Sequence, residues 1–191
     1  VVIHALTKYV VGHSDAMLGS ISANEKHWPR VKNTVYRLGL CASPDDAYLG
    51  LRGLRTMGVR LREQGTAALQ IAKTLEGHDE VQQVLHPALP GCPGHAIWKR
   101  DFKGSTGLFS ILLKRGNWAK LPAFVDHLEH FKMGFSWGGY ESLILPARFV
   151  RTARPWVEKS PVLRLSIGLE DPEDLLDDLL KGLDRYAQAL D

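Results

Sequence analysis

The sequence predicts an α/β chain in which strands alternate with helices and a helix-covered sheet forms the C-terminal part. Hydrophobic residues make up 45% of the 191 residues, which is enough for one or two compact domains with a core. Residues 162–170, VLRLSIGLE, alternate between apolar and other residues as a half-buried strand does. Residues 172–190 repeat leucine at helical spacing. These two segments together predict a sheet packed against a helix.

The C-terminal strand and helix can be described residue by residue. The alternation places Arg164 and Ser166 on one face of the strand, away from the apolar positions Leu163, Leu165, Ile167 and Leu169. Asp171 is a helix cap, and Pro172 occupies the first helical position. The apolar side of that helix is formed by Leu175, Leu176, Leu179, Leu180, Leu183 and Leu190.

The N-terminal part is predicted to hold two short buried strands, Val1–Ala5 and Ala16–Ala23, joined by the turn-rich sequence GHSD. An apolar stripe predicts a helix over Glu25–Leu38. A longer helix begins at Pro44, capped by Ser43, and runs to about Gly77. Glycines in that helix each cost about 1 kcal/mol relative to alanine, so we expect a bend or break near Met57 and Gly58.

The domain boundary is placed at this expected break, which gives domains 1–57 and 58–191. In the second domain, strands are expected at 81–87, 106–114 and 142–147. Residues 119–130 are expected to form a helix.

Charge and cysteine content exclude several classes of protein. The net charge of +3 comes from 24 basic and 21 acidic residues spread along the chain, so no nucleic-acid partner is expected. The arginines at 52, 55, 60 and 62 fit a solvated helix face or a contact between subunits. The sequence has no long apolar run, so no membrane partner is expected. The two cysteines, Cys41 and Cys92, are far apart, which indicates a reducing cytoplasm.

No metal is expected. His127 and His130 would share a face of the helix predicted for 119–130, but no further ligands with zinc-like spacing accompany them.

Lys8 is the first candidate for chemistry. It ends the first predicted strand, between Thr7 and Tyr9, and a turn follows it. A partly apolar setting of this kind favours the neutral amine, which is a nucleophile or a base. The alternative is an ordinary surface lysine after an edge strand, and the local setting alone favours this second interpretation.

Six segments resemble the Cys/Met-metabolism enzymes that depend on pyridoxal phosphate (PLP), in the order of that family. They are IHALTKYVVGHSDAMLG at 3–19, RGLRTMGVRL at 52–61, HPALPGCPGH at 86–95, WKRDFKGSTGLFS at 98–110, FSWGGYESL at 135–143 and LRLSIGLED at 163–171. The resemblance implies fold type I, with the end of a large PLP-binding domain followed by a smaller α+β domain. Trp137 and WKRDF resemble the bacterial cystathionine β-lyase branch.

The resemblance also implies roles for individual residues. Lys8 would form the Schiff base with PLP and move the proton of the substrate α-carbon, and Thr7 would donate to the cofactor phosphate. Arg164 would bind the substrate α-carboxylate, in a pocket shaped by Ser136 and Trp137. From the residues alone, Trp137 could instead be core, Ser136 a turn residue and Arg164 part of a structural ion pair.

The implied reaction is α,β-elimination of L-cystathionine to homocysteine, pyruvate and ammonia, in a homotetramer of paired subunits. The alternatives are a γ-acting relative, such as cystathionine γ-lyase or methionine γ-lyase, and a non-catalytic assembly-partner domain. Because the chain opens in an apolar run without Met and further family parts precede the lysine, we expect a C-terminal half that is inactive alone. Ala5, where the family commonly has serine, and Phe135, where relatives often have tyrosine, depart from the pattern.

Overall fold

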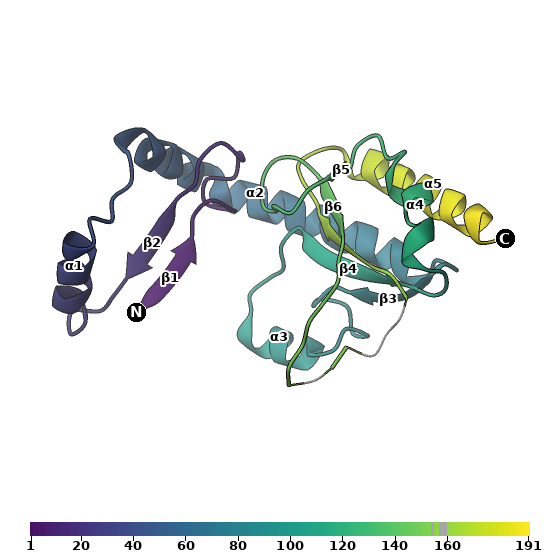
Figure 1. The fold of residues 1–191 in the computed structure, drawn as a ribbon, viewed down its shortest axis with the longest axis horizontal. Coiled ribbons are helices and arrows are strands. Elements are labelled where there is room, and N and C mark those ends of the chain that lie inside the picture. The colour runs from purple at the N-terminus through teal and green to yellow at the C-terminus, as the bar shows by residue number, and fades with distance from the viewer. Residues whose placement is uncertain (154, 157–159) are drawn as a thin grey trace. The chain divides into compact units, whose positions relative to one another are not determined.

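The computed structural model describes residues 1–153, 155–156 and 160–191 (Figure 1). The chain divides into two compact units, Val1–Val59 and Arg60–Asp191. Helix α2 (Pro44–Glu76) belongs to both units. The break expected near Met57 and Gly58 is wrong, because α2 continues through both residues. The domains 1–57 and 58–191 therefore stay a prediction.

Helix α2 starts as predicted, and two of its glycines, Gly53 and Gly65, lie where other backbone comes close. The amide of Asp46 donates to Ser43 Oγ over 3.0 Å, which is the expected N-terminal cap. A side chain at Gly53 would collide with the carbonyls of Val10 and Val11. Packing of this kind outweighs the low helix propensity of glycine, since most helical stability in proteins comes from tertiary contacts.

The first unit contains a two-stranded antiparallel ribbon of β1 (Val2–Ala5) and β2 (Gly19–Ser22), followed by α1 (Trp28–Arg37). Both strands and the helix were expected, but the expected burial of the strands is wrong. All of β1 is exposed, and β2 is exposed or half-buried. A ribbon of two strands has too little packing surface to bury its own side chains.

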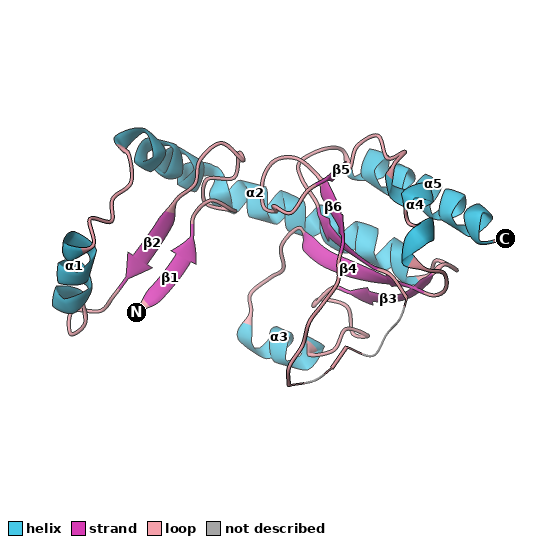
Figure 2. Cartoon of the chain, viewed as in Figure 1, coloured by secondary structure: helices cyan, strands magenta, loops and turns pink. Residues whose placement is uncertain are grey.

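The second unit is built on a five-stranded sheet in the order β3, β4, β7, β6, β5 (Figure 2). The strands are β3 (Val81–Leu85), β4 (Leu108–Leu113), β5 (Lys132–Met133), β6 (Leu143–Pro146) and β7 (Val162–Ser166). Neighbours are antiparallel except β5 and β6, which are parallel. Strand β7 therefore lies at the centre of the sheet, with β4 and β6 beside it.

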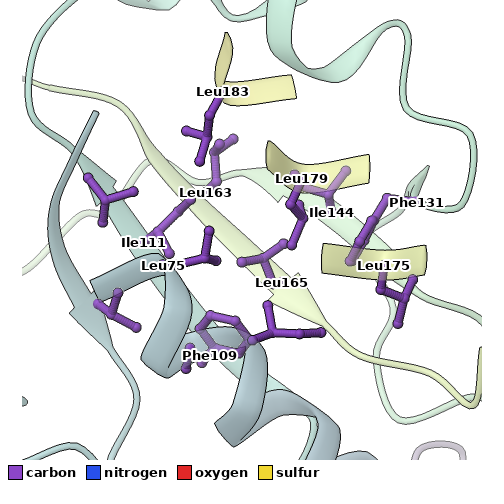
Figure 3. Packing of buried hydrophobic residues seen from close by; sticks show 14 of the residues in the cluster. Leu75, Phe109, Ile111, Phe131, Ile144, Leu163, Leu165, Leu175, Leu179 and Leu183 are labelled. Atoms are coloured by element: carbon purple, nitrogen blue, oxygen red, sulfur yellow. The ribbon is translucent and has the colours of Figure 1, made fainter. Parts of the chain in front are cut away.

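The hydrophobic core covers one face of this sheet (Figure 3). Leu163 and Leu165 of β7 are fully buried in it, together with residues of α2 and of α5 (Pro172–Leu190). Arg164 lies between the two leucines and therefore faces the other side of the sheet. The predicted alternation is confirmed within the strand, but Leu169 lies beyond its end and is 41% exposed.

The prediction of one helix over residues 119–130 is wrong. The structure has a 3-10 turn at Trp118–Lys120 and a short helix α4 (Pro122–Val125). Beyond α4, the amides of Glu129, His130 and Phe131 donate to the carboxylate of Asp178 instead of helical carbonyls, over 2.9 to 3.3 Å. The expected shared helix face of His127 and His130 therefore does not form.

Helix α3 (His95–Asp101) is a further element that the sequence did not indicate. Within the described residues, no helix is long and apolar enough to cross a membrane. The described part of the chain also brings together no group of three His, Cys, Asp or Glu side chains suited to a metal ion.

We expect Asp178→Asn to lower the free energy of unfolding by about 1–3 kcal/mol, because an amide replaces one acceptor oxygen of a side chain that is only 5% exposed. Urea unfolding with Asp184→Asn, an exposed position on the same helix, provides the matched comparison. Equal midpoints for the two variants would contradict the role given to Asp178.

The buried His86 predicts a pH dependence of stability. Its ring is fully buried, Nδ1 accepts from the amide of Ala88 over 3.2 Å, and burial lowers the pKa of the ring from its ordinary value of 6.5. The unfolded chain therefore binds more protons just below pH 6.5, so the unfolding free energy should fall as the pH drops. Urea unfolding from pH 7.5 to 5 should give a smaller slope for His86→Gln than for the parent. The exposed His127→Gln should keep the parental slope, and identical slopes for all three would refute the prediction.

Candidate active site

Lys8 lies in a tight turn that follows β1. The amide of Val11 donates to the carbonyl of Leu6 over 2.9 Å, and the amide of Gly12 donates to the carbonyl of Lys8 over 2.8 Å. Gly12 has φ 70°, a conformation that favours glycine. Lys8 is half-buried. The two hydrogen bonds fix the backbone that carries its amine.

The hydroxyl of Thr7 holds this turn to the segment before β2. It accepts from the amide of Leu18 over 2.9 Å and donates to the carbonyl of Leu18 over 3.2 Å. A hydroxyl has one hydrogen, so donation to a phosphate would require it to rotate away from the Leu18 carbonyl. The role expected for Thr7 at a cofactor phosphate stays a prediction.

In the second unit, Arg164 is surrounded by backbone carbonyls. Its Nη2 donates to the carbonyls of Gly134, Phe135 and Ser136 over 3.1, 3.0 and 3.0 Å. These three residues begin the loop between β5 and β6, which covers 134–142 and is called the carbonyl loop below. The side chain of Phe135 is 82% exposed, so this residue contributes its carbonyl rather than its ring.

Trp137 joins the same group. The Cζ atom of Arg164 lies 5.5 Å from the centre of the Trp137 ring, within the range of a cation–π interaction. Trp137 and Ser136 are both half-buried. The structure therefore brings Ser136, Trp137 and Arg164 together, as the resemblance implied, although Ser136 contacts the arginine through its backbone.

The guanidinium of Arg164 is suited to an anion. Within the described part of the chain it makes no ion pair, and its buried Nε has no hydrogen-bond partner. Burial lowers the pKa of Arg164 from its ordinary value. A guanidinium nonetheless stays charged in proteins and offers only donors. A carboxylate would neutralise the charge, and among the described residues Arg164 does not form the structural ion pair considered from the sequence.

Three polar residues that sequence reasoning did not select hold the carbonyl loop. Gln64 of α2 donates through Nε2 to the carbonyl of Gly139 over 2.6 Å. Glu170 accepts from the amide and the hydroxyl of Ser142, each over 2.7 Å. Ser142 and Glu170 lie inside the motif segments FSWGGYESL and LRLSIGLED, which was a usable signal. Gln64 lies inside a long helix and gave none.

Comparison with known proteins places these features in context. The family model of the Cys/Met metabolism PLP-dependent enzymes matches residues 1–184. The chain is 47% identical over 189 residues to the cystathionine β-lyases of Escherichia coli and of Salmonella typhimurium, in each case 96% of this chain and 48% of the relative. The chain thus spans about half the length of the curated relatives it matches.

Solved structures also match this chain over about half of their length. The chain is similar to the crystal structure of cystathionine γ-synthase from Xanthomonas oryzae pv. oryzae in complex with aminoacrylate and cysteine. The TM-score is 0.87 at 41% identity, and the match covers 98% of this chain and 50% of that one. This likeness to a fold type I enzyme confirms the predicted fold class.

We expect Gly168→Ala to destabilise the second unit and to displace the carbonyl loop. A Cβ at Gly168 would collide with the carbonyl oxygen of Tyr140 and would lie 2.6 Å from the carbonyl carbon of Glu141, and backbone atoms cannot move aside cheaply. The loss in unfolding free energy should be about 1–3 kcal/mol, measured by thermal unfolding. Gly104→Ala is the control, since a Cβ there has open space. Equal stability of the two variants would contradict the prediction.

Proposed function

Because the chain belongs to the Cys/Met metabolism PLP-dependent enzyme family, we propose that it forms part of an enzyme that cleaves L-cystathionine by α,β-elimination. In that reaction L-cystathionine and water give homocysteine, pyruvate and ammonia. The single observation that carries the proposal is the half-buried guanidinium of Arg164, which lies beside Trp137 and has an unpaired, buried Nε. The cystathionine β-lyases at 47% identity support the choice of substrate.

The residues present fit PLP chemically. When bound, PLP withdraws electrons from the substrate α-carbon and so stabilises negative charge there. Lys8 provides the primary amine that a cofactor aldehyde requires, on a half-buried turn fixed by its own hydrogen bonds. We propose that Lys8 holds the cofactor and that Thr7 contributes to the phosphate site.

Arg164 would bind the α-carboxylate of the substrate. Its Nη2 is held by three carbonyls, so the guanidinium plane is oriented before any ligand arrives. An oriented guanidinium loses little freedom on binding, and a carboxylate that displaced a carbonyl from Nη2 could pair with it through both oxygens. The Trp137 ring covers part of the same charged group, which limits its contact with water.

Lys8 would also move the proton of the α-carbon. A neutral Lys8 Nζ accepts that proton, and the resulting ammonium then carries it for return to a leaving group. An amine on a fixed turn suits this task because proton transfer requires a donor and an acceptor within hydrogen-bond distance. We propose this role for Lys8 as part of the same reaction.

A γ-acting relative is the second candidate. The cystathionine γ-synthase of Xanthomonas oryzae pv. oryzae has 41% identity and a TM-score of 0.87, so the same scaffold carries a γ-acting enzyme. Trp137 and the sequence WKRDF at 98–102 favour the β-lyase, because they resemble that branch.

We further propose that the working enzyme is a homo-oligomer of paired subunits in the cytoplasm. The first unit exposes a set of large apolar side chains that water disfavours, and these support the proposal that more protein covers them: Val2, Ile3, Met17, Trp28, Tyr36 and Leu40.

Reductive trapping tests the cofactor role of Lys8. Because the chain spans about half of its relatives, the assay uses a holoenzyme in which residues 1–191 follow the first half of the Escherichia coli relative. After reduction with borohydride, mass spectrometry should find the cofactor on the peptide that contains Lys8. Lys8→Ala should abolish this attachment, whereas the exposed Lys26→Ala should retain it. Attachment to another lysine would refute the assignment.

Product analysis of the same holoenzyme separates the two candidate reactions. Pyruvate with homocysteine supports β-elimination, and 2-oxobutyrate with cysteine supports the γ-acting alternative. Arg164→Lys should raise KM for L-cystathionine by about tenfold or more, because a point charge replaces an oriented two-donor contact. An unchanged KM would remove Arg164 from the carboxylate site.

A further inference from the structure

We propose that Glu170 and Ser142 are positioning residues for the carboxylate pocket around Arg164. The inference rests on the proposed function, because it concerns the same pocket. Neither residue touches Arg164 in the contacts described above. They act on the carbonyl loop, which supplies the three carbonyls that hold Nη2 and the Trp137 ring that lies near the guanidinium.

The carbonyl loop is fastened along its length to β7 and to the turn after it. Its start is held by Arg164 itself. In the middle, the amide of Gly138 donates to Ser166 Oγ over 3.3 Å, and the amide of Leu169 donates to the carbonyl of Tyr140 over 2.8 Å. The C-terminal end, at Ser142, is held through Glu170 and Gly168, and its carbonyl also accepts from the amide of Lys132 over 3.2 Å.

The attachment at Ser142 involves a charged carboxylate. The carboxylate of Glu170 accepts two hydrogen bonds from Ser142, one from the amide to Oε1 and one from the hydroxyl to Oε2, both 2.7 Å long. Ser142 is fully buried, so no water competes for its hydroxyl. Hydrogen bonds to a charged group are about twice as strong as neutral ones. Glu170 therefore fixes the direction in which the loop enters β6.

The hydroxyl of Ser142 also connects the loop to the turn. It accepts from the amide of Gly168 over 2.9 Å while it donates to Glu170. Because a hydroxyl has one hydrogen, these two bonds fix its orientation. Gly168 must be glycine for this approach, since a side chain there would collide with Tyr140 and with Glu170 itself.

The contact between Ser142 and Glu170 affects Arg164 because it joins two segments, β7 with the turn after it and the carbonyl loop. Strand β7 carries Arg164 and continues into the turn that holds Gly168 and Glu170. The carbonyl loop carries the acceptors of Nη2 and ends at Ser142. Fixing Ser142 to the turn therefore fixes the acceptors relative to the strand that carries the guanidinium. Loss of the contact between Ser142 and Glu170 should therefore weaken substrate binding and leave the rate of the chemical step nearly unchanged.

Glu170→Gln tests this in the holoenzyme described above. The amide keeps the size of the side chain but can accept only one of the two bonds. KM for L-cystathionine should rise about tenfold, the effect of losing about one hydrogen bond to a charged group, while kcat stays within about twofold. Hydrogen exchange of the peptide 134–143 should become faster. Glu173→Gln, an exposed glutamate in the first turn of α5, should change neither quantity.

Ser142→Ala and the double variant complete the test. Ser142→Ala, Glu170→Gln and the double variant should raise KM by the same factor, because both residues act through the one contact between them. A lower thermal midpoint with a parental KM would show that the pair is only structural, and it would overturn the inference. If the parent holoenzyme itself performs no elimination, the proposed function fails. An active parent with an unchanged KM in Glu170→Gln overturns the positioning role alone.

Discussion

One constraint governs the second unit: a charged guanidinium has to reside beside a hydrophobic core on the central strand of the sheet. Strand β7 alternates, so Leu163 and Leu165 enter the core while Arg164 faces the other side. A partly buried cation requires acceptors, and the carbonyl loop supplies them. The polar fastenings of that loop by Gln64, Ser166 and the Ser142–Glu170 pair then follow, because each keeps the acceptors in place.

The sequence allowed prediction of the elements whose causes are local. The cap at Ser43, the proline at 44 and the leucine spacing after Pro172 act within a few residues, and α2 and α5 begin where these features indicate. The alternation around Arg164 is local in the same sense. The six motif segments pointed to Ser136, Trp137 and Arg164, which lie in contact in the structure, because the segments resemble a family.

What could not be predicted depends on partners far away in the sequence. Glu170 and Ser142 are separated by 28 residues, and Gln64 and Gly139 by 75, so no local pattern pairs them. The continuity of α2 past Gly58 depends on packing elsewhere along the helix rather than on helix propensity. Strand β1 is exposed because it pairs with β2 in a two-stranded sheet. The alternation of side chains in the sequence does not reveal how many strands a sheet contains.

The carboxylate of Asp178 has a consequence for the order of folding. Its three acceptor bonds join residues 47 to 49 positions apart, so they cannot form before α5 has docked. Until then, we expect residues 119–130 to follow the helical preference that the sequence indicates. We expect the nascent chain to hold a transient helix in this segment, and docking of α5 then lets Asp178 fix residues 129–131 in the native turn.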